Sequence, residues 1–130
     1  GGVLEAMILP ALERSGYAIE RQVIVGTRCG GGMQKVDAVA TRDDERILVS
    51  LPWQQTRGTA EQKVPFEVMC LADAVREQRA ARAYLVLGGD GWTLRNYFTS
   101  GALADHLVHA ALVKVVTLEA FVRLANNGEL

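Results

Sequence analysis

The chain has 130 residues, 49% of them apolar, and a formal net charge of −1. This length and apolar content suffice for one domain with a substantial core, so we expect a single domain over residues 1–130. The near-neutral charge excludes a global basic field, and any site for a polyanion must therefore be a local patch. No apolar run reaches the roughly 18 residues of a membrane span. No signal peptide is visible either, and we expect no membrane partner.

The two cysteines, Cys29 and Cys70, lie far apart in the sequence and have no metal-ligand spacing around them. A disulfide framework would need more cysteines, so we expect both to be reduced thiols in a cytoplasmic protein. The chain begins with Gly1-Gly2 rather than an initiator Met, which suggests that residues precede it in the full protein.

The first half of the chain predicts a helix followed by three strands. Apolar residues recur at helical spacing from Leu4 to Leu12, which predicts a helix over residues 2–15 that Pro10 kinks or divides. Next come three segments rich in alternating apolar and β-branched residues, typical of strands. They are residues 17–27, 33–41 and 46–53, separated by a glycine-rich turn and a charged hairpin loop.

The second half predicts alternating helices and strands. Apolar residues at helical spacing predict a helix over residues 60–78, with Thr59 as its N-cap. The remaining predicted elements are a buried parallel-type strand at 83–87, short helices at 92–98 and 103–110, a strand at 113–116 and a closing helix at 118–126. This order favours an α/β fold with a mixed central sheet flanked by helices.

Asp37 is the most informative residue of the predicted strands, because it is a carboxylate in an otherwise apolar segment. Such a group is costly to bury unless it pairs with a cation. One explanation is a pair with Lys35, which shares its strand face, at the rim of the sheet. The other is a hard oxygen ligand for Mg²⁺. Glu5, in the first turn of the opening helix, is the natural second carboxylate, although solvent exposure would also explain it.

Two segments resemble a known family. The first is Val36-Asp37 followed across the hairpin by Val49-Ser50-Leu51-Pro52-Trp53-Gln54, and the second is Gly58-Thr59-Ala60-Glu61-Gln62-Lys63-Val64-Pro65-Phe66. Through them, residues 1 to about 74 resemble the PD-(D/E)XK nuclease superfamily, the restriction-endonuclease-like fold. Its order of elements, α-β-β-β-α-β, matches the predicted order.

The resemblance implies a role for each matching position. Asp37 takes the place of the metal-binding aspartate, and Glu5 that of a first-helix glutamate that assists the metal. Ser50 falls at the second acidic position and Pro52 at the lysine, while Ser50 and the Leu51 carbonyl would complete the metal site.

Further positions follow from the same resemblance. Gln54 matches a glutamine that positions water or phosphate, and Lys63 matches a helix lysine. Either Lys63 or Lys35 could replace the missing lysine, although Lys63 could instead pair with Glu67. Arg28 and Arg57 are candidate phosphate contacts, or solvated loop residues.

Three side chains in the strand-tip segment leave alternatives open. Ser50 offers only a neutral oxygen, and Pro52 offers neither a cation nor a backbone donor. Loss of a positioned catalytic group typically costs about 10²–10³ in rate. Trp53 could stack on a base or simply pack at the rim of the sheet.

From the resemblance we expect a Mg²⁺-dependent (or Mn²⁺-dependent) endonuclease that acts on double-stranded DNA. We expect Pro52 in the lysine position to impair its cutting, and Pro52→Lys to increase it. Cutting both strands needs two sites, which favours a homodimer. The alternative is a catalytically inactive nuclease-fold module that binds DNA or mediates assembly. In a third interpretation, Pro52 is an engineered or accidental replacement in an otherwise active enzyme.

Overall fold

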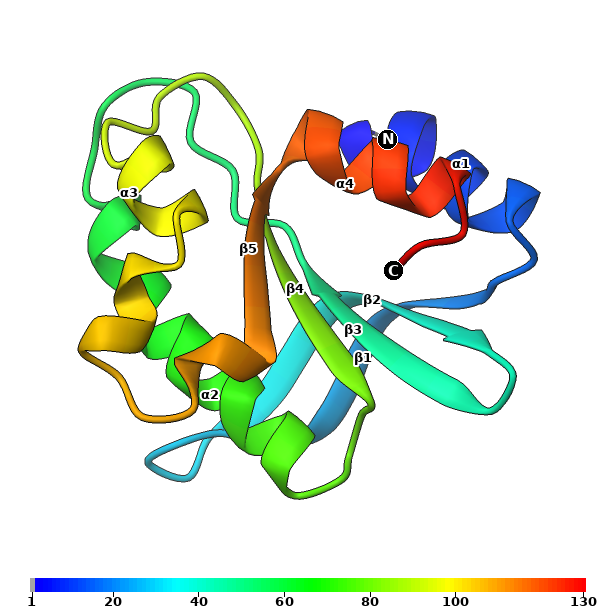
Figure 1. Ribbon diagram of the computed structural model, residues 1–130, viewed down its shortest axis with the longest axis horizontal. Helices are drawn as coiled ribbons and strands as arrows, with labels where there is room; N and C mark the ends of the chain where they lie inside the picture. Colours follow the sequence, from blue (N-terminus) through cyan, green and yellow to red (C-terminus); the bar gives the residue numbers. More distant parts are fainter. Residues whose placement is uncertain (1) are drawn as a thin grey trace.

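The computed structural model describes residues 2–130 and places one mixed five-stranded sheet between two layers of helices (Figure 1). The strands lie side by side in the order β1-β2-β3-β4-β5. Their bounds are β1 Ala18–Thr27, β2 Met33–Arg42, β3 Glu45–Ser50, β4 Arg82–Leu87 and β5 Val113–Thr117. The first three strands are antiparallel neighbours, whereas β4 pairs in parallel with both β3 and β5.

The helices fall into two groups on opposite sides of this sheet. A π-helical turn, η1 (Leu4–Ile8), leads directly into α1 (Leu9–Arg14), so the helix changes type just before Pro10. The other helical elements are η2 Ala60–Lys63, α2 Val64–Arg76, α3 Arg95–Thr99, η3 Ala102–Asp105, η4 Ala110–Leu112 and α4 Leu118–Asn126. No helix within residues 2–130 is both long and apolar enough to cross a bilayer.

The tight hairpin between β2 and β3 fixes the position of Asp37. Asp43 and Asp44 form its turn with φ of 55° and 64°, the left-handed conformation that two-residue hairpins favour. Pairing then runs from Arg42 opposite Glu45 to Ala38 opposite Val49. Asp37 consequently lies at the point where β3 leaves its ladder with β2.

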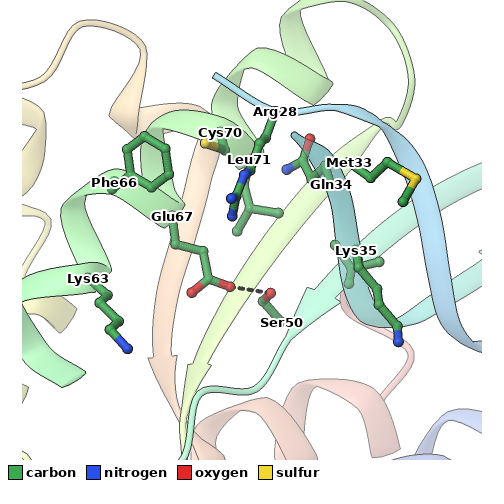
Figure 2. Close-up of a pocket in the computed structure, with 11 residues that line it drawn as sticks. Arg28, Met33, Gln34, Lys35, Ser50, Lys63, Phe66, Glu67, Cys70 and Leu71 are labelled. Atoms are coloured by element: carbon green, nitrogen blue, oxygen red, sulfur yellow. Dashed lines mark hydrogen bonds between the residues drawn. The ribbon is translucent and has the colours of Figure 1, made fainter. Parts of the chain in front are cut away.

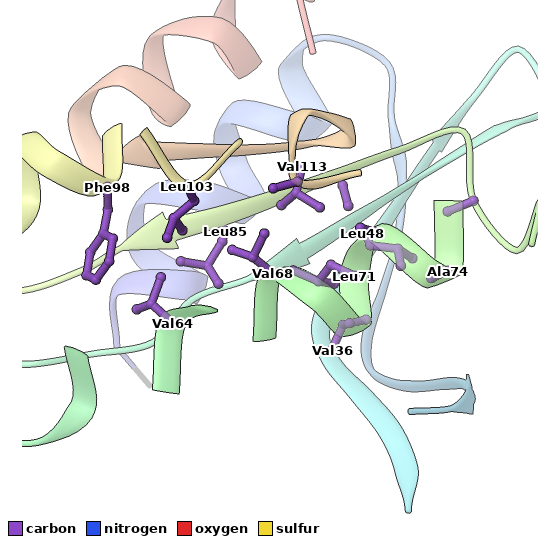
Figure 3. Close-up of a cluster of buried hydrophobic side chains, with 14 of the residues drawn as sticks. Val36, Leu48, Val64, Val68, Leu71, Ala74, Leu85, Phe98, Leu103 and Val113 are labelled. Atoms are coloured by element: carbon purple, nitrogen blue, oxygen red, sulfur yellow. The ribbon is translucent and has the colours of Figure 1, made fainter. Parts of the chain in front are cut away.

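Side chains alternate between the two faces of β3, and each face has its own apolar core. Leu48 packs with Val36, Val68 and Leu71 under α2 (Figure 3). On the opposite face, Val49 packs with residues of α1 and α4, including Leu12 and Phe121. Ser50, the next residue on the α2 side, therefore points toward that helix.

The structure confirms the predicted fold class and the order of the main elements. The predicted single helix over residues 103–110 is wrong, because two separate helical turns, η3 and η4, occupy this region. Only Leu103 and Ala110 are fully buried there, and His109 adopts a left-handed φ of 70° that ends a regular helix. Thr59 precedes η2 but makes no side-chain capping bond.

Candidate active site

Asp37 is held against the end of β3 by the backbone. Its Oδ2 atom accepts a hydrogen bond of 2.6 Å from the Leu51 amide, and its side chain is half-buried. The alternative ion pair with Lys35 does not form in the described part of the chain. The carboxylate is thus fixed in orientation, while no cation among residues 2–130 forms an ion pair with it.

A second carboxylate, Glu67 on α2, reaches the same strand end. The Ser50 hydroxyl donates a hydrogen bond of 2.5 Å to Glu67 Oε1 (Figure 2). Burial raises the pKa of Glu67 above its ordinary value, the bond from Ser50 opposes this rise, and the negative charge of Asp37 adds to it. Two acids from different elements therefore converge around the tip of β3.

A cavity of about 300 Å³ opens beside this acid pair, between α2 and the beginning of β2. Ser50 and Glu67 lie in its wall, and Lys63 and Lys35 flank them on opposite sides (Figure 2). Arg28 also lines the cavity. None of these three cationic side chains forms an ion pair within residues 2–130. The wall of the cavity therefore carries a local concentration of positive charge, although the net charge of the protein is close to zero.

The donor atoms at this site are all oxygens. They comprise the carboxylates of Asp37 and Glu67 and the Ser50 hydroxyl. Hard oxygen donors suit Mg²⁺ or Mn²⁺, which are commonly held by one or two carboxylates with water and substrate phosphate completing the shell. Within the described chain no group of three or more His, Cys, Asp or Glu residues is placed to hold a metal ion. Any divalent ion here would therefore keep several non-protein ligands.

Glu5, the second acid expected from the sequence, has a different partner. Its carboxylate forms an exposed ion pair of 3.1 Å with Arg21 of β1. The helical turn that carries Glu5 packs on the sheet face opposite α2. Glu5 and Glu67 thus belong to opposite layers of the molecule.

Pro52 and Trp53 extend β3 toward β4 rather than into the cavity. The Pro52 carbonyl accepts a hydrogen bond of 3.0 Å from the Gly88 amide, and Trp53 forms an isolated bridge with Gly88. The Trp53 side chain is 48% exposed. Neither residue lines the cavity that contains Ser50 and Glu67.

Gln54 joins two loops. Its Nε2 atom donates to the Gly91 carbonyl at 2.8 Å, and its Oε1 atom accepts from the Ala60 amide at 3.1 Å. The side chain is buried, and both of its polar groups are engaged by backbone. Arg57, in the same connection, is exposed and does not line the cavity.

Glu61 is another buried carboxylate, but it is fully engaged. It accepts hydrogen bonds from the Thr93 hydroxyl and from the Leu94 amide, the latter at 2.6 Å. These bonds lower its pKa below the ordinary value, because they favour the charged form. Glu61 therefore ties the start of the helical segment to the loop after β4.

Sequence reasoning missed Glu67 as a site residue and considered it only as a partner for Lys63. A signal was present, since Glu67 lies three residues after Val64 and four before Leu71, within the apolar stripe of α2. A carboxylate inside such a stripe must face the sheet. No Lys63–Glu67 ion pair forms in the structure of residues 2–130.

Comparisons with known proteins bear on the family and the fold of the chain. The PD-(D/E)XK nuclease superfamily domain, a family whose members generally use divalent metals, matches residues 1–129. A crystal structure of a protein of unknown function, AF1548, is similar at 18% identity with a TM-score of 0.52. That similarity covers 93% of this chain and 63% of the other, and it supports the fold alone. No curated protein matches the chain.

Proposed function

Because the chain belongs to the PD-(D/E)XK nuclease superfamily, we propose that it is a metal-dependent endonuclease that hydrolyses DNA in the cavity beside Ser50. One observation carries the proposal. Asp37 and Glu67 converge on the end of β3, and the charge of one raises the pKa of the other. Two acids this close are unfavourable unless a cation or a proton separates them.

In this proposal Asp37 and Glu67 are the two charged ligands of a divalent ion. Ser50 and the Leu51 carbonyl add neutral oxygens, and the Leu51 amide keeps Asp37 oriented through its bond of 2.6 Å. When bound, the ion supplies an activated water and neutralises charge on the phosphate. Glu67 thereby takes the role of the acid that is absent at position 50.

Pro52 occupies the position of the family's catalytic lysine, so another residue must supply that positive charge. Pro52 has no cation and lies outside the cavity, whereas Lys63 and Lys35 both line it. A fixed positive charge near the scissile phosphate stabilises the negative charge that grows in the transition state. We assign this role to Lys63, which comes from the same helical segment as Glu67, and give Lys35 and Arg28 the task of holding the phosphate backbone.

A second candidate function is that of an inactive module that retains DNA binding. The specific observation in its favour is Pro52, which removes the cation from the strand tip without affecting the basic wall of the cavity. The two proposals share the binding surface and differ only in chemistry. The prediction of a homodimer remains open under both.

Plasmid nicking in the presence of Mg²⁺ or Mn²⁺ tests the proposal. The purified chain, Asp37→Asn and Glu67→Gln are compared with Glu61→Gln as the matched control, since Glu61 is a buried carboxylate outside the cavity. We expect metal-dependent nicking by the parent chain and by the control, and none by the other two. Intact plasmid with every protein, together with retained DNA binding, would favour the inactive module.

A further inference from the structure

We propose that the cavity beside Ser50 and Glu67 receives an unpaired nucleotide whose base stacks on Phe66. This inference rests on the proposed function, because it specifies the substrate of the same site. It departs from the expectation of a fully double-stranded substrate. The substrate class it names is DNA with a single-stranded segment, such as a flap, a gap or a frayed end.

The first argument is the exposure of two apolar side chains in the cavity wall. Phe66 on α2 is 46% exposed, and Met33 at the beginning of β2 is 72% exposed. Both line the cavity that contains Ser50 and Glu67, and Figure 2 shows them on opposite sides of it. An exposed aromatic ring and a flexible thioether thus line one cavity beside the acid pair, and together they form an apolar clamp.

The second argument is the charge of the same wall. Arg28, Lys35 and Lys63 line the cavity, and their side chains make neither an ion pair nor a hydrogen bond to any other residue of the described chain. An apolar peptide or a second copy held by the clamp would leave three cations without partners. A nucleotide satisfies both requirements, because its phosphates meet the cations while its base meets the clamp.

The third argument is the geometry of bases in a duplex. Inside a double helix each base is already stacked on its neighbours, and its face is unavailable to a protein ring. A protein aromatic side chain therefore stacks on bases of single-stranded or extruded nucleotides. Phe66 and Glu67 line the same cavity, so a base on the Phe66 ring would belong to a nucleotide near the phosphate under attack.

Fluorescence anisotropy of labelled oligonucleotides in EDTA tests this inference without cleavage. Three probes are compared: a short single strand, its duplex, and a strand of equal length that carries abasic sites. The proteins are the parent chain, Phe66→Ala, Phe66→Tyr and Tyr97→Ala. Tyr97 is the matched control, because it is an aromatic residue with 43% exposure that does not line the cavity.

We expect the parent chain to bind the single strand more tightly than either other probe. Phe66→Ala should weaken single-strand binding by about tenfold or more, the effect of losing one aromatic stacking partner. Phe66→Tyr and Tyr97→Ala should retain the affinity. Binding of the abasic strand should not respond to Phe66→Ala, because only the phosphate contacts remain.

Equal affinity for the abasic and the normal strand would overturn the inference, as would a preference for the duplex. Unchanged single-strand binding by a folded Phe66→Ala variant would also overturn it. Failure of the proposed function looks different. In that case no nicking occurs with any metal, while the dependence of single-strand affinity on Phe66 persists.

Discussion

Two carboxylates on consecutive helical segments, the buried Glu61 and the half-buried Glu67, have opposite environments. Glu61 accepts hydrogen bonds from Thr93 and Leu94, and these bonds lower its pKa. Glu67 is desolvated by burial, accepts a bond from Ser50 and faces Asp37, and its pKa is raised. The fold satisfies the charge of the first residue and leaves that of the second partly unsatisfied.

The contrast separates a structural acid from a functional one. A carboxylate whose two oxygens both accept hydrogen bonds gains less from a metal ion, because its charged form is already stable. A desolvated carboxylate opposite another acid gains much, and such perturbed groups in a cleft are candidates for catalysis or metal binding. We therefore propose a structural role for Glu61 and a role in metal binding for Glu67.

The largest expected effect is on cleavage by the acid pair. Asp37→Asn and Glu67→Gln should each lower the nicking rate by more than about a hundredfold, because each removes a charged ligand. Glu61→Gln should retain most of the activity at a temperature where it is folded. Single-turnover nicking rates with saturating Mg²⁺ measure all three. Comparable losses at Glu61 and Glu67 would break the distinction between them.

The next effect concerns the substitute lysine. Lys63→Ala should lower the nicking rate by about 10²-fold, the typical cost of losing one positioned charge in the transition state. Lys35→Ala should act mainly through a weaker affinity for DNA. Measuring kcat and KM for both variants separates the two roles, because Lys63→Ala should mainly lower kcat and Lys35→Ala should mainly raise KM. A strong gain of activity in Pro52→Lys, with no loss in Lys63→Ala, would contradict the assignment of Lys63 and show that the catalytic lysine belongs at position 52.

Stability should depend on pH in opposite ways for the two acids when no divalent metal is present. The raised pKa of Glu67 means that its contribution to folding is present below its ordinary pKa and is lost as the pH rises through the folded value. Glu67→Gln should therefore be more stable than the parent chain at neutral pH, with the difference vanishing in acid.

For Glu61 the sign reverses. Its lowered pKa means that its contribution to folding is present above the ordinary value and is lost as the pH falls through the folded value. Glu61→Gln should be destabilised at neutral pH by about 1–2 kcal/mol and less so in acid. Urea unfolding midpoints of the parent chain and both variants, measured from acid to neutral pH, check both predictions. Parallel curves for the two variants would contradict the comparison.

The smallest effect is expected at Glu5. Its ion pair with Arg21 is exposed, and such pairs contribute about 0–1 kcal/mol to stability. Glu5→Gln should therefore change the nicking rate by only a small factor and the unfolding free energy very little. A loss as large as that in Asp37→Asn would show that the opening helix supplies a metal ligand.

The sequence was enough for the fold because its local signals agree with one another. Helical spacing in α2 and α4, the strand alternation in β1–β3 and the Asp43-Asp44 turn each predict what the structure contains. The segment from Leu103 to Ala110 was mispredicted because its apolar spacing looks helical, whereas Val108 is exposed and His109 adopts a left-handed φ that interrupts a helix.

Most of the candidate site was also predictable. Asp37 and Ser50 follow from the motif, and their meeting at the strand tip follows from the hairpin register. Glu67 was not predicted, because its role depends on α2 lying over the end of β3, which is a tertiary contact. The local pattern around Gln54 similarly gave no sign that both of its polar groups bind loop backbone.

Crystals soaked in Mn²⁺ test the central claim most directly, by anomalous scattering at the manganese edge. The account predicts a peak between the carboxylates of Asp37 and Glu67, adjacent to Ser50, with oxygen atoms at about 2.2 Å. The peak should be absent in Glu67→Gln and retained in Glu61→Gln. Manganese bound elsewhere, or none beside Asp37 in well-ordered crystals, would contradict the assignment of this cleft as the metal site.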